Sequence, residues 1–380
     1  MHAGKIWYTS LMNFKWKTLL LIFLLGMGGF LYAQWDNASL TYSRPTEEVA
    51  AAPVVPGAPS KGVGMTLPMS KTIPNLLHVG QSFNNCSSVG LLIALSRWGI
   101  TETQERIADG TRPWNNPTGN NDDKSVTLYE LAHYAENNHG MITYVRPNGN
   151  IELLKKFVAN DIPVLTRALM YKDDDIVHYR VIRGYDESKK ILIESDGIEG
   201  AFKKYTYEKW MHMWKDFNYS YAIIVPEEKR KIVEAILAEE KDEIVAWKNA
   251  KTRAESEIAK NPNNLWASYN LITALYYTGD YEGTVREFEK IEDNLTRRKL
   301  WYQIEPIEAY FKLGKYDRVV QLVDEQANDN NKSISELYVL KGKIYELRGD
   351  KVKAEAEYEK AIYYNKSLQS AKDALVTLKV

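Results

Sequence analysis

The pattern of hydrophobic and polar positions divides the 380-residue chain into four regions. Region 1–35 contains a long uncharged run, which predicts an N-terminal signal anchor that spans a membrane. Region 36–71 is rich in Pro, Ala and Gly, a composition that cannot build a core and predicts a disordered linker. Region 72–227 mixes strand and helix spacing, which indicates an α+β domain. Region 228–380 has helical spacing throughout and predicts an all-α domain.

The uncharged run covers residues 19–33 and is preceded by Lys15 and Lys17. Positive residues before an apolar run keep that flank in the cytoplasm. We therefore expect a single-pass protein of the cytoplasmic membrane, held by its N-terminal helix, with the bulk of the chain on the extracytoplasmic side. Cleavage of the segment as a signal peptide is the alternative.

Similar heptapeptides recur in the C-terminal region every 35 residues. Their glycines stand at Gly279, Gly314 and Gly349, and each lies between two amphipathic helical patterns. A small residue between paired helices at this period is typical of a helix-turn-helix repeat array. The pattern resembles the tetratricopeptide repeat over residues 263–366, with a capping helix at 367–378, and the resemblance implies binding of a protein partner. An ordinary helical bundle is the alternative.

Charge and composition exclude several classes of protein. The chain has 49 Lys and Arg against 50 Asp and Glu, and this balance argues against a nucleic-acid binder. One cysteine excludes a disulfide framework and a cysteine-cluster zinc site. The sequence also lacks HExxH, P-loop and complete GxGxxG motifs, so we expect no metal and no cofactor.

The single cysteine, Cys86, precedes an apolar stretch at 87–98 that predicts a buried helix ending at Gly99. Asn84 and Asn85 are good capping residues and place Cys86 at the N-terminus of this helix. The helix dipole and the unbonded backbone N–H groups there favour a thiolate. The alternative is a cysteine that packs as a small hydrophobic residue.

Among the six histidines, His178 is the one that opens a strand pattern. A second strand follows at 191–196, and a turn centred on residues 187–188 places His178 opposite Asp196 or Gly197. Directly opposed side chains are ~5 Å apart at Cβ, close enough for a carboxylate to hold an imidazole. The pattern thus indicates a cysteine, a histidine and an orienting aspartate.

The stretch from Gln81 to Cys86, with the apolar helix after it, resembles the cysteine motif of the peptidase C39-like family of bacteriocin-processing cysteine peptidases. His178-Tyr179 and the later Asp196 resemble the histidine motif and third catalytic residue of that family. The resemblance implies a papain-like fold that acts on a peptide or protein substrate. It also implies Cys86 as nucleophile, His178 as general base, Asp196 as the group that orients the imidazole, and Gln81 as an oxyanion donor.

The sequence departs from the family pattern directly after the cysteine, where Ser87-Ser88 replaces Gly-Pro or Gly-Ala. A side chain there can crowd the backbone beside a substrate carbonyl. The leading hypothesis is a thiol hydrolase, that is, a cysteine peptidase. The alternatives are a catalytically inactive peptidase-like scaffold that binds peptide, and an acyl transferase that uses the same thiol.

Overall fold

The computed structural model describes residues 66–112, 126–296, 298–328 and 334–379. The predicted anchor at 1–35 and most of the predicted linker at 36–71 lie outside these residues. Among the described helices, none combines the length and the apolar character needed to cross a bilayer.

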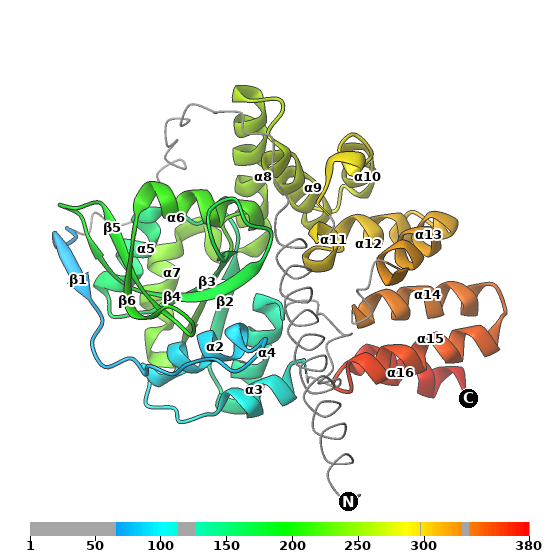
Figure 1. The fold of residues 1–380 in the computed structure, drawn as a ribbon, viewed down its shortest axis with the longest axis horizontal. Helices are drawn as coiled ribbons and strands as arrows, with labels where there is room; N and C mark the ends of the chain where they lie inside the picture. The colour runs from blue at the N-terminus through cyan, green and yellow to red at the C-terminus, as the bar shows by residue number, and fades with distance from the viewer. Residues whose placement is uncertain (1–65, 113–125, 297, 329–333, 380) are drawn as a thin grey trace, which may run out of the picture. The chain divides into compact units, whose positions relative to one another are not determined.

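Within the described residues, the first domain is built on a seven-stranded antiparallel sheet (Figure 1). Its main path runs β2-β7-β3-β4-β5-β6, and β1 pairs with β4 beyond the end of β3. The strands are β1 Ser70–Thr72, β2 Ile142–Arg146, β3 Val164–Leu169, β4 Val177–Asp186, β5 Ile191–Asp196, β6 Gly200–Thr206 and β7 Tyr221–Val225. The predicted strands at 178–186 and 191–196 are therefore present, and ordered pairing begins slightly before residue 72.

Six α-helices and three short 3₁₀ turns pack with this sheet in the described part of the domain. The helices are α2 Cys86–Ser96, α3 Gln104–Gly110, α4 Leu128–His139, α5 Ile151–Ala159, α6 Tyr207–Trp214 and α7 Arg230–Leu237, and the turns are η1 Lys215–Phe217, η2 Glu227–Lys229 and η3 Ala238–Lys241. Helix α2 is buried from Ser87 to Leu95, as its apolar sequence predicts. Helix α7 contributes Val233, Ile236 and Leu237 to the same hydrophobic core, so this core extends past residue 227.

The hairpin of β4 and β5 differs from the predicted register. Residues 187–190 form the turn, and an irregularity lies between Ile182 and Gly184. Val181 pairs with Ser195, so the same register continued by one residue places Arg180, rather than His178, opposite Asp196. The prediction of direct opposition was wrong because it assumed a two-residue turn centred on residues 187–188, whereas the turn has four residues. His178 is instead a diagonal neighbour of Asp196.

The C-terminal region is helical, as predicted. Its elements are α8 Glu243–Lys260, α9 Leu265–Tyr277, α10 Tyr281–Glu289, η4 Glu292–Asn294, α11 Lys299–Tyr302, α12 Glu305–Lys312, α13 Tyr316–Asn328, α14 Ser335–Leu347, α15 Lys351–Tyr364 and α16 Gln369–Leu378. Gly279, Gly314 and Gly349 stand between consecutive helices with φ of 83°, 71° and 78°. These left-handed conformations explain the glycine at each turn. Helix α16 corresponds to the predicted capping helix.

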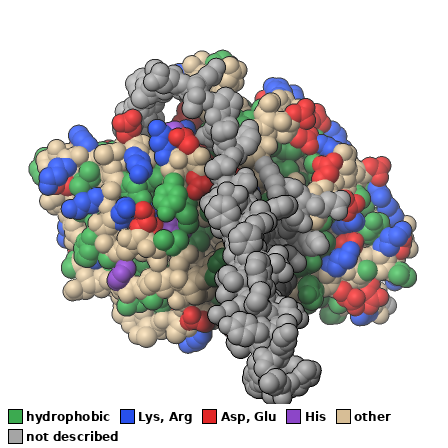
Figure 2. Space-filling view, in the orientation of Figure 1, with side chains coloured by type: hydrophobic (Ala, Val, Ile, Leu, Met, Phe, Trp, Pro, Cys, Tyr) green, Lys and Arg blue, Asp and Glu red, His purple; other side chains and the backbone are tan. Residues whose placement is uncertain are grey.

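Charged side chains of both signs are interspersed over the face seen in Figure 2. This distribution agrees with the near-zero net charge of the whole chain.

Candidate active site

Cys86 is the first residue of α2, where the sequence predicted it. The loop before it is held by α3, because Gln104 Oε1 accepts hydrogen bonds from the backbone N–H (2.8 Å) and the hydroxyl (3.1 Å) of Ser82. Asn85 occupies the N-cap position but makes no side-chain cap, and it donates to Ser82 Oγ instead (2.8 Å). The first-turn N–H groups of α2 therefore have no side-chain acceptor from the N-cap, which suits the stabilisation of a thiolate or an oxyanion there.

Two glycines bring the first turns of α2 against the hairpin. A Cβ on Gly90, one turn after Cys86, would lie 3.4 Å from Cβ of Tyr179, the residue that follows His178. A Cβ on Gly197, the residue that follows Asp196, would lie 3.1 Å from Cγ1 of Val89. The sequence neighbours of His178 and Asp196 therefore both pack against the turn of helix that begins at Cys86.

His178 and Asp196 are in direct contact. Nε2 of His178 lies 2.9 Å from Oδ2 of Asp196, and both side chains are buried. The other oxygen, Oδ1, accepts from the backbone N–H groups of Ile198 (2.6 Å) and Glu199 (3.0 Å). Burial alone would raise the pKa of Asp196, but its contacts with His178, Arg180 and the backbone hold that pKa well below its usual range. Asp196 is therefore an ionised carboxylate at neutral pH.

The second ring nitrogen, Nδ1 of His178, is buried and has no hydrogen-bond partner within the described residues. Because Nε2 faces an ionised carboxylate, Nε2 carries the proton in the neutral ring and Nδ1 is the acceptor. Nδ1 is thus the atom that can take a proton from a thiol.

Gln81 lies next to the end of β5. Its backbone N–H donates to the carbonyl of Gly197 (3.0 Å), and a Cβ on Gly197 would come within 3.0 Å of the Gln81 side chain. Oε1 of Gln81 is buried and accepts no hydrogen bond from the described residues. The structure therefore places Gln81 beside Asp196, in the loop that leads into α2.

Ser87 and Ser88 follow Cys86 and are 3% and 1% exposed. Their side chains pack into the protein interior, so they add little to the accessible surface on which a substrate would lie.

Two charged residues at this site were missed in the sequence analysis, Arg180 and Glu194. Nε of Arg180 lies 2.9 Å from Oδ2 of Asp196 and 3.1 Å from Oε1 of Glu194. Both side chains are buried. The available signal was strand periodicity, since residues two apart on a strand share a face, and Arg180 and Glu194 each stand two residues from a predicted site residue.

Carboxylate oxygens of Glu194, Asp196 and Glu199 lie within 4.8 Å of one another, the spacing of a possible cation site. Arg180 and Lys203 already supply positive charge to this group, with Lys203 Nζ 2.9 Å from Glu199 Oε1. We therefore assign these carboxylates to ion pairing.

Comparison with known proteins gives one family match, in the first domain. The sequence model of the Peptidase_C39 like family matches residues 70–225. A comparison with curated proteins gives no match.

Among solved structures, a Bacillus anthracis protein assigned as a C39-like peptidase is 16% identical and covers 42% of this chain and 98% of its own, with a TM-score of 0.33. The peptidase domain of Streptococcus ComA, a bi-functional ABC transporter of a quorum-sensing pathway, is 16% identical and covers 40% of this chain and 98% of its own, with a TM-score of 0.31. A thermophilic tetratricopeptide-repeat protein of Thermus thermophilus is 20% identical and covers 36% of this chain and 74% of its own, with a TM-score of 0.30. Residues 70–225 thus match the Peptidase_C39 like family, and a helical region that resembles tetratricopeptide repeats follows them.

Proposed function

We propose that this protein is a cysteine peptidase in which Cys86, His178, Asp196 and Gln81 hydrolyse peptide bonds. The main support is the His178–Asp196 contact at 2.9 Å, with Nδ1 buried and unbonded among the described residues. A carboxylate that fixes one ring nitrogen leaves the other as a base, and Cys86 at a helix N-terminus is a thiol disposed to ionise.

The proposed reaction has two halves. Nδ1 of His178 takes the thiol proton, the sulfur of Cys86 attacks the scissile carbonyl carbon, and the C–N bond breaks as the imidazolium protonates the leaving amine. The oxyanion is stabilised by the backbone N–H of Cys86 and by the side-chain N–H of Gln81. The first half leaves the acyl group on Cys86 as a thioester. In the second half, His178 deprotonates a water, which attacks the thioester carbonyl; the C–S bond breaks, and the imidazolium returns the proton to the sulfur of Cys86.

Cys86 is the only cysteine in the chain, so alkylation at a single mass increment measures its reactivity directly. We expect iodoacetamide to label the folded full-length protein at pH 6 at least about tenfold faster than free cysteine, because only the thiolate reacts and a thiol pKa lowered by one unit gives that factor. His178→Gln should abolish the excess rate.

The matched control is His133→Gln, since His133 is an exposed histidine on α4 that pairs with Glu136. Its labelling rate should equal that of the wild-type protein. Slow labelling that is the same in the wild-type protein and in His178→Gln would disprove the peptidase proposal.

The second candidate function is a peptide-binding scaffold with an inert thiol. It is favoured by Ser87 and Ser88, which replace the residues that the family carries after its cysteine. In a scaffold, Cys86 is a half-buried thiol with no activating base and would be labelled no faster than free cysteine, so the same experiment separates the two functions.

We also propose that residues 19–33 anchor the protein in the cytoplasmic membrane, that the peptidase lies on the extracytoplasmic side, and that the helical region recruits a protein partner. The supports are the two lysines before the apolar run and the regular spacing of the turn glycines. Deletion of residues 1–35 should move the protein from the carbonate-washed membrane fraction to the soluble fraction. Retention in the membrane would contradict the anchor.

A further inference from the structure

All the contacts of the Arg180 side chain described here lie inside the first domain. It lies on β4, two residues after His178, and is 1% exposed. Its Nη1 donates to the carbonyl of Leu169 (2.9 Å) and its Nη2 to the carbonyl of Met170 (2.5 Å), both at the end of β3. The guanidinium is thus fixed to the backbone of the neighbouring strand.

The third donor, Nε of Arg180, lies 2.9 Å from Oδ2 of Asp196. This is the oxygen that also contacts Nε2 of His178 at 2.9 Å. Oδ2 of Asp196 is therefore held by both the guanidinium of Arg180 and the imidazole of His178. Because the guanidinium is fixed, it determines the position of the oxygen that accepts from the imidazole.

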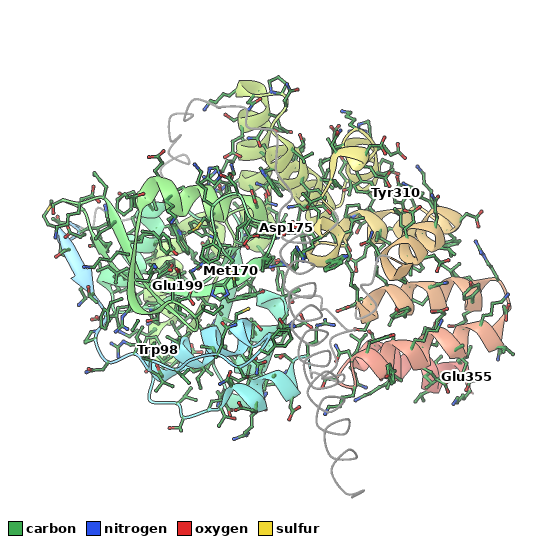
Figure 3. The ribbon with its side chains drawn as sticks, in the orientation of Figure 1. Trp98, Met170, Asp175, Glu199, Tyr310 and Glu355 are labelled. Atoms are coloured by element: carbon green, nitrogen blue, oxygen red, sulfur yellow. The ribbon has the colours of Figure 1, made fainter. Side chains whose placement is uncertain are left out.

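Several charged groups surround the contact between Arg180 and Asp196. Figure 3 labels Glu199, which is one of them, and Met170, whose carbonyl accepts from Arg180. Glu194 Oε1 lies 3.1 Å from Nε of Arg180, and Glu199 Oε2 lies 3.9 Å from Nη2. Glu199 is paired with Lys203 and accepts from the hydroxyl of Tyr205, whose ring centroid is 5.7 Å from Cζ of Arg180.

Two buried carboxylates thus compete for one guanidinium. Burial raises the pKa of Glu194 well above its usual range, against the attraction of Arg180. The pKa of Asp196 is held low by its contacts with His178, Arg180 and the backbone. Burial thus favours the protonated form of Glu194, whereas Asp196 is ionised, so Arg180 is the counter-ion of the carboxylate that faces His178.

We propose that Arg180 is a positioning residue: its guanidinium keeps Asp196 ionised and oriented toward Nε2 of His178, so that Nδ1 is the ring nitrogen left to accept the proton of the Cys86 thiol. The catalytic part of this inference rests on the proposed function. The effect of Arg180 on the His178 ring can be measured separately, without any reaction of Cys86.

The first experiment measures the iodoacetamide labelling rate of Cys86 between pH 4 and pH 9 in the full-length protein. In Arg180→Met, Asp196 keeps its contacts with His178 and the backbone but loses the positive charge of Arg180, so its pKa should rise by about 1–3 units. A protonated Asp196 cannot hold the imidazolium, so the labelling rate should begin to fall at a higher pH than in the wild-type protein. At pH 4, the acid end of this range, we expect a loss of up to about twofold.

Arg183→Met is the matched control. Arg183 is also a buried arginine of β4, but it donates to Ser195 Oγ (3.0 Å) and to the carbonyl of Ile73 (2.8 Å). Arg183→Met should not change the pH at which the labelling rate falls on the acid side of the profile, which we call the acid limb. Glu194→Gln should also leave it in place, because burial favours the neutral form of Glu194. Arg180→Lys restores the positive charge, so its acid limb should lie close to that of the wild-type protein. If Arg180→Met does not fold, Arg180→Lys is the variant that is compared with the wild-type protein.

The second experiment observes the histidine ring without using the thiol. In protein labelled with ¹⁵N-histidine, the His178 signals, assigned by their loss in His178→Gln, should show a single ring state in which Nε2 carries a proton shared with Asp196. Arg180→Met should convert them to a mixture of ring states, whereas Arg183→Met should not. Unreactive Cys86 with this NMR result would refute the proposed function alone. Unchanged His178 signals and an unchanged acid limb in folded Arg180→Met would overturn the role of Arg180.

Discussion

At the end of β5, Asp196 is buried and ionised, and both properties affect stability. Its pKa is held below the ordinary aspartate value in the folded protein, so it stabilises the fold above about pH 4, and this contribution is lost as the pH falls toward the folded pKa. Asp196→Asn should lower the free energy of unfolding at pH 7 by about 3 kcal/mol, because Arg180 loses its charged partner. Urea titrations at pH 7, 5 and 3 should show the gap between wild type and variant narrowing with acid. A gap that widens with acid would contradict the assignment.

Glu194 predicts the opposite pH dependence. Burial raises its pKa in the folded protein, so its contribution to stability is present below its unfolded pKa, near 4.3, and is lost as pH rises toward the raised value. Over that range the wild-type protein loses up to about 1.4 kcal/mol of unfolding free energy per pH unit, and Glu194→Gln removes this loss. Thermal unfolding at pH 5 and pH 8 should therefore show Glu194→Gln gaining stability relative to wild type as pH rises. A constant difference at both pH values would mean that Glu194 is ionised throughout.

At the scale of elements, the approach of α2 to the sheet depends on Gly90. A Cβ at this position would lie 2.7 Å from Cδ1 of Leu165 and 3.4 Å from Cβ of Tyr179. Gly90→Ala gains up to about 1 kcal/mol of helix propensity, but overpacking costs about 1–3 kcal/mol and moves α2 away from β4. We expect a net loss of stability and slower labelling of Cys86.

Leu165→Val removes the atom that the new methyl group would meet, so the double variant Gly90→Ala/Leu165→Val should recover part of both losses. The free energies of unfolding and the labelling rates of the four proteins form a double-mutant cycle. Additive losses in that cycle would show that the two residues do not touch.

The turn glycines of the helical region give a prediction at the same scale. Gly314 has φ of 71° and joins α12 to α13, and a Cβ there would meet no atom within 4 Å. Any cost of Gly314→Ala is therefore conformational, and we expect about 1–2 kcal/mol. Gly314→Asn should cost less, because asparagine tolerates this conformation. Equal stability of the alanine and asparagine variants in urea unfolding would contradict this explanation.

Periodic features of these elements could be predicted from the sequence, and local irregularities could not. The apolar run after Cys86 predicted α2, and the spacing of Gly279, Gly314 and Gly349 predicted the repeat turns, because each depends on neighbours close in the chain. The hairpin register differed from the prediction because the turn has four residues, 187–190, rather than two, and the irregularity between Ile182 and Gly184 then shifts the pairing by one residue. Strand periodicity places Arg180 on the same face as His178, but its contact with Asp196 depends on this register and was missed.

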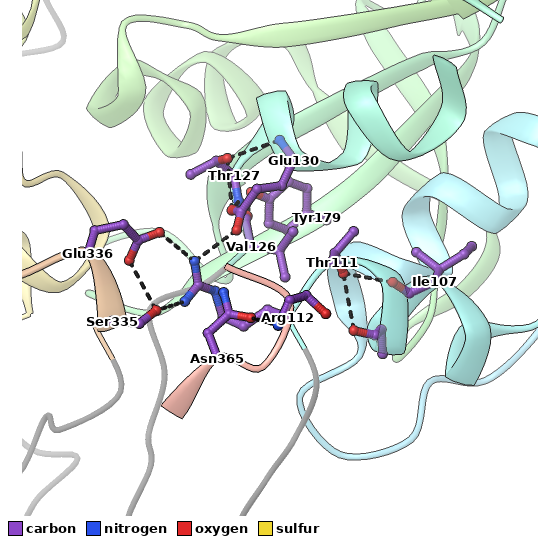
Figure 4. Close-up of polar contacts among 12 residues, drawn as sticks. Ile107, Thr111, Arg112, Val126, Thr127, Glu130, Tyr179, Ser335, Glu336 and Asn365 are labelled. Atoms are coloured by element: carbon purple, nitrogen blue, oxygen red, sulfur yellow. Dashed lines mark hydrogen bonds and ion pairs between the residues drawn. The ribbon is translucent and has the colours of Figure 1, made fainter. Parts of the chain in front are cut away.

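At the scale of the whole molecule, Arg112 connects the first domain to the helical region (Figure 4). Its Nη2 lies 2.8 Å from Glu130, the residue that closes the capping box of α4, and 2.8 Å from Glu336 at the start of α14. Its Nη1 donates to Ser335 Oγ (3.0 Å). The side chain of Arg112 is 7% exposed, and the two carboxylates hold its pKa above the ordinary arginine value against the effect of burial. One cation thus holds two acidic residues that lie far apart in the sequence.

Arg112→Met should therefore weaken the coupling between the two regions more than it weakens either alone. Removing one partner of a buried ion pair costs about 3 kcal/mol, and here the loss falls on contacts that join α4 to α14. We expect faster amide hydrogen exchange at the first turns of α4 and α14, with little change in β3, β4 and β5, and a urea transition that separates into two steps. Arg106→Met is the control, because Arg106 is 71% exposed and pairs with Glu102 inside the first domain. Since His178 and Asp196 make their contacts within the first domain, the Cys86 labelling rate should be unchanged in Arg112→Met, and a reduced rate would show that the helical region supports the site through this arginine.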